Sequence, residues 1–221
     1  MAALLHVLAI NWPFMLKALA MTLAVSSGSM ALGLLAGTII AIGRTYGGRF
    51  ADIALGFYVD TMRSIPVLVI LVWGYLALPL LTGRSLTPFI AAVLALGLHL
   101  AAYVAETVRA GLTSVRPGQM RAALALGMSR WQAIKQIILP QALVRMLPPL
   151  GSLLVIAVKD SAISSVIAVP ELIRQTQVLV SNTYLSFQLY TFTMIVFFLI
   201  CYPVARGVDH IYRRLAYLGA S

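Results

Sequence analysis

The sequence contains little charge, and most of that charge has one sign. Of its 221 residues only 10% are charged, with 16 basic residues against 6 acidic ones. In contrast, 61% of the residues are hydrophobic and the mean hydropathy is +0.96. A soluble core of this length cannot bury so much apolar surface. The composition therefore excludes a soluble globular protein and indicates an integral membrane protein.

Three further absences narrow the function. Cys201 is the single cysteine, which excludes an intrachain disulfide and a cysteine-based metal cluster. No glycine is followed by lysine, so the chain lacks the P-loop through which many ATPases bind phosphate. The N-terminus also lacks the basic region of a cleavable signal peptide. We therefore expect the first membrane span to serve as its own signal.

Long apolar runs are what the sequence has in abundance. A membrane span needs about 20 apolar residues, and five segments meet that length. The sequence thus predicts an all-α integral membrane protein with about five transmembrane helices. The predicted spans are residues 18–43, 64–82, 88–110, 147–169 and 187–205.

The first predicted span carries small residues at every fourth position. Ser29, Gly33 and Gly37 fall on one face of a helix. Small side chains at this spacing allow another helix to approach closely. We interpret the stripe as a packing surface.

Basic residues gather in two of the loops and in the C-terminal tail. The loops after the second and fourth spans hold only Arg84 and Arg174. Because cytoplasmic loops are rich in Lys and Arg, this predicts an external N-terminus and a cytoplasmic C-terminus. The asymmetry also explains the net charge of +10 without a nucleic-acid partner. The residues on the cytoplasmic side are Arg44, Arg49, Arg116, Arg121, Arg130, Lys135, Arg145, Arg206, Arg213 and Arg214.

The stretch from Arg121 to Pro140 is amphipathic in an otherwise apolar chain. Helical spacing of its apolar residues stops at Gly127, where a left-handed residue would end a helix. Ser129 and Gln132 have the spacing of a capping box, so a second helix begins there, and Pro140 is predicted to end it. This hairpin either lies on the lipid headgroups or docks a cytosolic partner.

Two charged residues lie near the middle of the fourth predicted span. An ionisable side chain at this depth costs about 3 kcal/mol unless it faces a partner or a wet cavity. Lys159 and Asp160 are adjacent on a helix, so they point in different directions and do not simply neutralise each other. One interpretation is that they line a substrate pathway. The other is that each forms a structural ion pair with a neighbouring span.

Four polar residues of the third predicted span are candidates for a function or an ion pair. His99 lies near its middle, with Tyr103 one turn further on the same face. A lone histidine there is either a hydrogen-bonded packing residue or a ligand-binding one. Glu106 and Arg109 are three positions apart near the inner end, so we expect them to form a structural ion pair.

Arg63 and Pro66 mark where the second predicted span enters the membrane. An arginine at such a position can bury its aliphatic stem while its guanidinium reaches the headgroups. We interpret Arg63 first as an interfacial residue, with a place in the substrate pathway as the alternative.

The amphipathic hairpin resembles the cytoplasmic loop of ABC importer permeases. Their signature is Glu-Ala-Ala, three residues, Gly, nine residues, Ile, one residue, Leu-Pro. Arg121 stands where the family usually has Glu, so the resemblance extends to docking and not to a salt bridge from that glutamate. The matching residues are Ala122, Ala123, Gly127, Ile137, Leu139 and Pro140.

Further motifs between Asp60 and Leu172 resemble the polar amino acid branch of these permeases. They cover about half of the chain, and the first and last spans agree only in hydrophobicity. The motifs are Arg63-Ser64-Ile65-Pro66, Tyr103 with Glu106 and Arg109, Pro117-Gly118-Gln119, Lys159-Asp160-Ser161 and Glu171-Leu172.

The resemblance implies a type I ABC importer transmembrane domain over residues 1–221, with a coupling hairpin at 116–146. It also implies a multi-pass protein of the bacterial inner membrane, in contact with lipid, that carries an amino acid by alternating access. The expected partners are two copies of an ABC ATPase, a second permease that is identical or homologous, and an extracytoplasmic substrate-binding protein. No catalysis and no cofactor are expected in this chain, because ATP and Mg would bind the partner ATPase.

Two other function classes remain open at this point. A proton-coupled secondary transporter would use His99, Asp160 and Glu106 as a relay. An intramembrane enzyme would use His99 with Asp160 or a serine, but no catalytic triad or metal-ligand spacing supports it. Neither alternative explains the hairpin.

Overall fold

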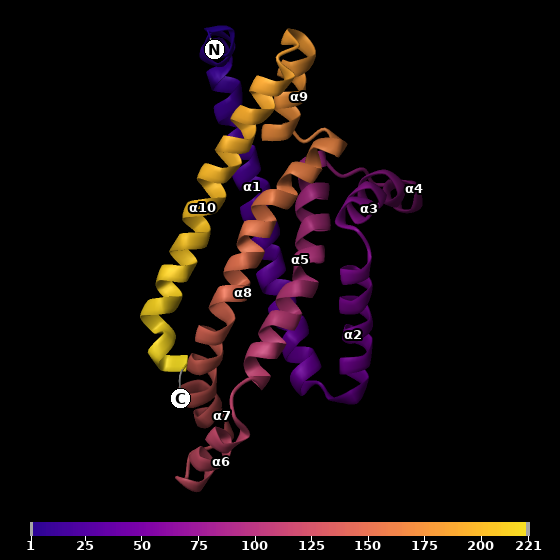
Figure 1. Cartoon of the computed structure of the whole chain (residues 1–221). Coiled ribbons are helices and arrows are strands. Elements are labelled where there is room, and N and C mark those ends of the chain that lie inside the picture. The colour runs from indigo at the N-terminus through magenta and orange to yellow at the C-terminus, as the bar shows by residue number, and fades with distance from the viewer. Residues whose placement is uncertain (1, 220–221) are drawn as a thin grey trace.

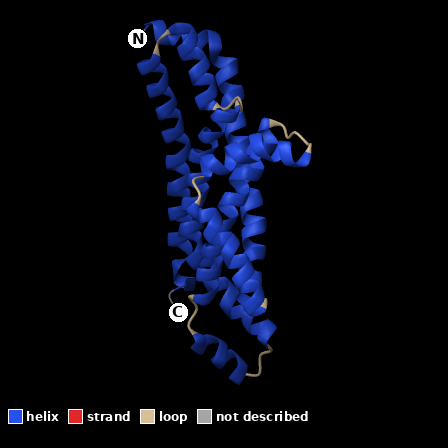
Figure 2. Ribbon diagram, turned by 90° about the vertical axis from the view of Figure 1, so that its right-hand side faces the viewer, coloured by secondary structure: helices blue, strands red, loops and turns tan. Residues whose placement is uncertain are grey.

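A computed structural model describes the backbone of residues 2–219 and the side chains of residues 6–215. The ends of the predicted domain, residues 1, 220 and 221, lie outside this part. The described chain is helical throughout and contains no strand (Figure 2). Its elements are α1 (Ala2–Tyr46), α2 (Gly48–Ser64), α3 (Val67–Val72), the π-helical turn η1 (Trp73–Ala77), α4 (Leu78–Thr82), α5 (Pro88–Thr113), α6 (Pro117–Ala125), α7 (Arg130–Ala133), the π-helical turn η2 (Ile134–Ile138), α8 (Leu139–Asp160), the 3₁₀ turn η3 (Ser161–Ile167), α9 (Leu172–Thr183) and α10 (Ser186–Gly219).

Four helical segments are long and apolar enough to cross a membrane. They run side by side as a bundle, with the N-terminus and α9 at one end and α6 and α7 at the other (Figure 1). The predicted count of about five helices is confirmed, since the bent pair Gly48–Ser64 and Val67–Thr82 is also long and apolar enough when its two arms are taken together. The four unbroken segments are His6–Tyr46, Pro88–Thr113, Arg130–Ile167 and Ser186–Leu215.

The second predicted span, residues 64–82, begins at a sharp bend in the chain. Helix α2 ends at Ser64, and α3 leaves it at an angle of 103°. Ile65 and Pro66 both have ψ near 132°, an extended conformation. A residue before proline avoids the helical region because the proline ring would clash with it. Arg63 therefore lies directly before the bend between α2 and α3.

The small-residue stripe of α1 packs directly against α5. A Cβ atom added to Gly37 would lie 2.6 Å from the carbonyl oxygen of Ala101 and 2.7 Å from the Cβ of Val104. One added to Gly33 would lie 3.0 Å from the Cβ of Leu100. Because these contacts leave no room for a side chain, the predicted packing role of the stripe is confirmed. This close pair forms the centre of the bundle.

Candidate functional site

The predicted end of the first hairpin helix at Gly127 is confirmed. Gly127 has φ = 82°, the left-handed conformation that glycine adopts without penalty. Its N–H donates to the carbonyl of Leu124 at 3.0 Å, and the N–H of Met128 donates to that of Ala123 at 3.1 Å. These two bonds form a Schellman motif, which satisfies the carbonyls at the end of α6.

The predicted capping box is also present. The N–H of Gln132 donates to Oγ of Ser129 at 3.3 Å, and the N–H of Ser129 donates to Oε1 of Gln132 at 2.8 Å. Together with the Schellman motif, the box fixes a tight turn between α6 and α7. We call the two helices and this turn, residues 117–133, the elbow. The elbow lies beyond the other helices at one end of the bundle (Figure 1).

The prediction that Pro140 ends the second hairpin helix is wrong. Pro140 lies in the first turn of α8, directly after the π-helical turn η2, and the helical segment continues from Arg130 to Ile167. Proline is tolerated in a first turn because no N–H donor is required there. The wider π turn separates that first turn from α7. The hairpin's second arm is therefore the beginning of a membrane-spanning helix.

The residues that match the family signature divide between buried and exposed positions. Ala123 is buried and Ile137 is half-buried, so these two hold the elbow against the protein. Next to them, Leu126 is 82% exposed and Trp131 is 71% exposed, which leaves apolar surface for a partner. The exposed members of the signature are Ala122, Gly127, Leu139 and Pro140.

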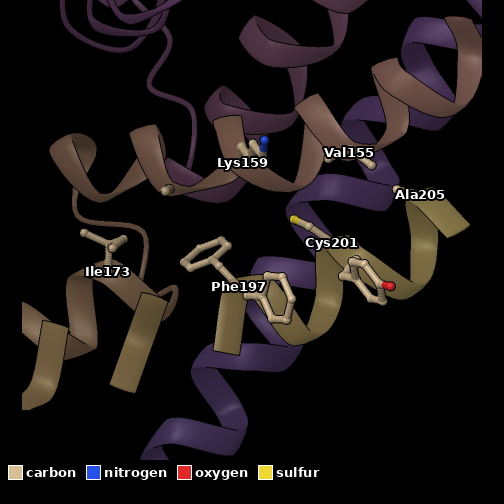
Figure 3. Close-up of a pocket in the computed structure, with 9 residues that line it drawn as sticks. Val155, Lys159, Ile173, Phe197, Cys201 and Ala205 are labelled. Carbon is tan, nitrogen blue, oxygen red and sulfur yellow. The ribbon is translucent and has the colours of Figure 1, made fainter. Parts of the chain in front are cut away.

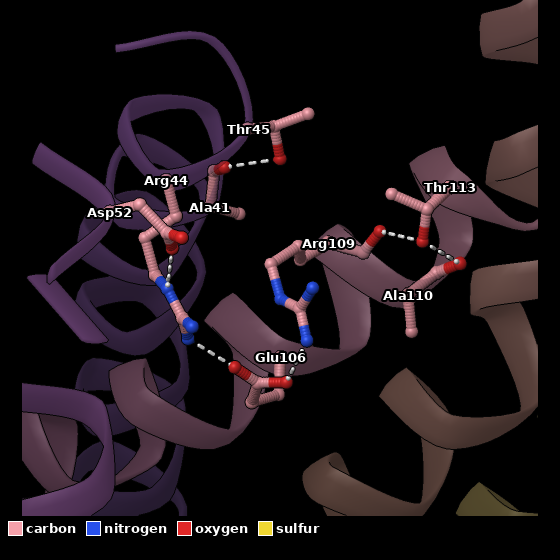
Figure 4. A network of polar contacts seen from close by, with 8 residues as sticks. All are labelled: Ala41, Arg44, Thr45, Asp52, Glu106, Arg109, Ala110 and Thr113. Atoms are coloured by element: carbon pink, nitrogen blue, oxygen red, sulfur yellow. Dashed lines mark hydrogen bonds and ion pairs between the residues drawn. The ribbon is translucent and has the colours of Figure 1, made fainter. Parts of the chain in front are cut away.

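Four charged residues form a network between α1, α2 and α5, toward the end of the bundle that carries α6 and α7. Nη2 of Arg109 lies 3.0 Å from Oε2 of Glu106, the pair that the sequence spacing predicted. Arg44 of α1 donates through Nη1 to the other oxygen of Glu106, and through Nε to Asp52 at 3.1 Å (Figure 4). Sequence reasoning placed Arg44 only in a basic loop, since its partner lies 62 positions away. Both oxygens of Glu106 are thus engaged by guanidinium groups.

Three predicted pathway residues come together between α2 and α5. The guanidinium carbon of Arg63 lies 5.5 Å from the ring centre of Tyr103, a cation–π contact. The rings of Tyr103 and His99 are 5.1 Å apart and tilted by 58°. His99 is buried and hydrogen-bonds the backbone of Met62, but its Nδ1 has no partner among the described residues. The packing of α2 against α5 brings Arg63 to this cluster.

Lys159, Asp160 and Ser161 lie at the far end of α8. Lys159 lines a cavity of about 480 Å³ between α8 and α10, whose lining also includes Phe197 and Cys201 (Figure 3). Asp160 is half-buried, and no ion pair or hydrogen bond is found for either charged side chain within the described residues. Ser161 is buried and donates to the carbonyl of Val158 at 2.7 Å. Within the described part of this chain, neither charge has the structural ion pair that was the alternative interpretation.

Glu171 is a buried carboxylate that sequence reasoning missed as a site. It is fully buried in the segment between α8 and α10, where it accepts the N–H groups of Ile173 at 2.9 Å and Arg174 at 2.7 Å. Burial raises the pKa of Glu171 to about 7, although these two bonds lower it. The visible signal was a glutamate between Pro170 and an amphipathic helix, the position of an N-cap.

Metal binding has no structural basis in the described part of the chain. No three side chains of His, Cys, Asp or Glu gather there closely enough to hold an ion.

Comparisons with known proteins agree across nearly the whole chain. Residues 29–217 match the family described as "Binding-protein-dependent transport system inner membrane component". The chain is 36% identical over 204 residues to the glutamine transport system permease protein GlnP of Escherichia coli (strain K12), covering 92% of this chain and 91% of the relative. It is 33% identical to the glutamate/aspartate import permease protein GltK of Escherichia coli O157:H7, covering 92% and 94%.

Solved structures show the same architecture. A crystal structure of an amino acid ABC transporter with histidines superposes with a TM-score of 0.87 at 32% identity, covering 94% of this chain and 96% of that one. An inward-facing MetNI methionine ABC transporter superposes with a TM-score of 0.71 at 22% identity, covering 94% and 98%. The second likeness establishes the fold alone.

Proposed function

The chain belongs to the family of inner membrane components of binding-protein-dependent transport systems, and from this premise we propose how it works. It is the membrane-spanning permease subunit of an ATP-driven amino acid importer. It is not itself an enzyme, because ATP hydrolysis lies on a partner subunit of such systems. Its own task is to open a path for the amino acid on one side of the membrane at a time.

The continuity between the elbow and a membrane-spanning helix carries the proposal. From Arg130 in the elbow to Asp160, the helix extends about 45 Å without a loop. Movement of a docked ATPase can therefore reach the far end of α8 through one continuous helical segment. The Schellman motif and the capping box hold the elbow stiff, and the exposed Leu126 and Trp131 supply an apolar docking surface.

The partners follow from the family. Two ATPase subunits, with ATP and Mg²⁺, bind the elbows of this permease and of a second one that is identical or homologous. A substrate-binding protein delivers the amino acid on the opposite face of the membrane. The loop charges support this orientation, since they place the elbow and the C-terminus in the cytoplasm and the N-terminus outside.

The substrate path is proposed to pass the polar groups at membrane depth. Asp160 has no partner among the described residues, so it is suited to accept the ammonium group that all amino acids share. Lys159 and Ser161 adjoin it on α8, and His99, Tyr103 and Arg63 form a second polar cluster between α2 and α5.

The proton-coupled alternative has no support in the geometry. A relay through His99, Asp160 and Glu106 needs groups that exchange protons. Both oxygens of Glu106 instead bind arginines, and no hydrogen bond in the described part of the chain joins the three residues.

Reconstitution tests the proposal. The permease is purified with its ATPase, placed in proteoliposomes with the binding protein outside, and screened for uptake of the twenty amino acids with and without internal ATP. We expect the ATPase to co-purify stoichiometrically and uptake to require ATP hydrolysis. Uptake that follows a proton gradient in the absence of the ATPase would establish the secondary transporter instead.

A further inference from the structure

A second polar cavity lies between α2, α5 and α8, in the half of the bundle that carries the elbow. Its volume is about 460 Å³, within the range of small-molecule sites. Arg63 comes from α2, and Glu106, Thr107 and Ser114 come from α5. Since Glu106 and Ser114 are eight residues apart on one helix, the cavity extends about 12 Å along α5. Arg145 of α8 completes its inner end.

The charges around this cavity do not cancel. Arg44 and Arg109 are matched by Asp52 and Glu106, which they contact directly. Arg63, in contrast, rests on the ring of Tyr103 and contacts no carboxylate among the described residues. Arg63 therefore offers a positive charge to an anion. A guanidinium is well suited to a carboxylate, which it can bind through two parallel hydrogen bonds.

The other lining groups suit the rest of an amino acid. Glu106 accepts one bond at each oxygen, and an ionised carboxylate has about four acceptor positions. It can therefore also accept bonds from an ammonium group. The hydroxyl of Thr107 adds a neutral donor and acceptor, and Ala110 and Gly111 complete the lining without polar side chains.

The inner end of the cavity is held in place by a contact between two helices. Nη1 of Arg145 donates to the carbonyl of Ser114 at 2.5 Å and lies 3.3 Å from its Oγ. Because α8 carries the elbow, a displacement of α8 at this point changes the width of the cavity. Arg145 and Asp160 are 15 residues apart on α8, about 22 Å, so the cavity is separate from the far-end cluster around Asp160.

We propose that this cavity is a binding site for the transported amino acid, which we call the inner station. The α-carboxylate binds Arg63 and the ammonium group faces Glu106. The inference rests on the proposed importer function. An amino acid held there from the cytoplasmic side blocks the return of the permease to its outward-facing state. Accumulated product thus slows further uptake.

The test uses the assembled complex in proteoliposomes with ATP inside and the binding protein outside. The probe is the amino acid that the wild-type complex takes up best, placed unlabelled in the lumen at increasing concentration while initial uptake of labelled substrate is measured. We expect Arg63→Gln to raise the lumenal concentration for half-inhibition about tenfold, the loss of one charged hydrogen-bonded pair. Arg214→Gln, an exposed arginine away from the cavity, serves as the matched control and should leave it unchanged.

Chemical variants of the probe distinguish an amino acid site from a general anion site. The α-amide of the same amino acid, which lacks the carboxylate, should inhibit at least tenfold more weakly from the lumen. Inorganic phosphate should not inhibit at concentrations where the amino acid does. Equal inhibition by phosphate would overturn the amino acid assignment.

Further variants keep the test decisive if Arg63→Gln does not assemble. Arg63→Lys retains the charge and Thr107→Val retains the volume, and each should weaken lumenal inhibition about fivefold. If the lumenal concentration for half-inhibition is unchanged in all assembled variants and ATP-driven uptake is normal, the inner station is overturned and the importer function is left intact. Absence of ATP-driven uptake in the wild type would overturn the importer function itself.

Discussion

The guanidinium of Arg44 and the carboxylate of Glu106 form an ion pair between α1 and α5, although the two residues are 62 positions apart. The side chain of Arg44 is 13% exposed and that of Glu106 is 24% exposed. The pair is thus shielded from water and salt more than a surface pair would be. Because Arg44 also forms an ion pair with Asp52, a single guanidinium joins α1, α2 and α5 near the end of the bundle that carries the elbow.

Removing Arg44 should destabilise the bundle. Arg44→Gln leaves one oxygen of a partly buried carboxylate without its guanidinium, and we expect a cost of about 2 kcal/mol, between the values for exposed and buried pairs. The melting temperature of the detergent-solubilised protein measures the effect. Asp52→Asn is the matched control, because Asp52 is 53% exposed and its loss should cost less than about 1 kcal/mol. Equal shifts of the melting temperature for both variants would contradict the central position of Glu106 in the ion-pair network.

Gly127 should be the least replaceable residue of the elbow because of its backbone conformation. A Cβ at Gly127 meets no atom of this chain within 4 Å, but φ = 82° disfavours any branched side chain. We expect Gly127→Val to stay in the membrane but to lose the ATPase in co-purification or to abolish ATP-driven uptake.

Two controls separate backbone strain from bulk at the elbow. Gly127→Asn should retain most ATPase binding, since asparagine tolerates the left-handed region. Gly118→Ala on the same helix, which is also open but has no positive φ, should be neutral. If Asn fails as completely as Val, steric contact with the ATPase, and not strain, limits this position.

Asp160 should be required for transport and not for assembly. We expect Asp160→Asn to preserve the complex with the ATPase but to reduce uptake at least tenfold, because it removes the charge offered to the substrate ammonium. The effect of Lys159→Gln on uptake should differ from that of Asp160→Asn, since Lys159 lines the cavity between α8 and α10. Normal uptake by Asp160→Ala would exclude the residue from both substrate contact and essential structure. Failure of Asp160→Asn to assemble would assign it a structural role.

Glu171 should make stability depend on pH. Its pKa in the folded protein is raised from 4.5 to about 7 by burial, so between these values the folded state holds a proton that the unfolded state has lost. Stability therefore falls as the pH rises from about 4.5 to about 7, by about 3 kcal/mol in total. The melting temperature of wild type and Glu171→Gln, measured from pH 4 to 8, isolates this contribution. The variant should be the more stable protein above pH 7, and parallel curves would show that Glu171 does not titrate in this range.

The loop charges predict the orientation of the chain. A reporter that is active only in the cytoplasm should work when fused to the C-terminus, and one that is active only outside should work when inserted between Thr82 and Thr87. The positive-inside rule gives this result because Arg84 is the only basic residue of that loop. The reverse pattern would contradict the placement of the elbow in the cytoplasm.

The sequence alone determined those features that depend on neighbouring residues. The Schellman motif at Gly127, the capping box of Ser129 and Gln132, and the pair of Glu106 and Arg109 all join groups within a few positions of each other. Hydropathy likewise located the four unbroken apolar segments, because a bilayer requires a continuous apolar length. The signature of the elbow could be recognised for the same reason, since its residues lie within 20 positions.

Only the tertiary structure decided which distant groups meet. The π turn lets the helix continue through Pro140, and the packing of α2 against α5 brings Arg63 to Tyr103. Arg44 meets Glu106, and the N–H of Leu172 reaches Oγ1 of Thr22, 150 positions away, beside the buried Glu171. Such contacts depend on how helices pack as rigid bodies, and small residues such as Gly33 and Gly37 fix that packing through close backbone approach. A local sequence pattern does not determine the distances between residues that are far apart in the chain. The polar clusters could therefore be identified only in the folded chain.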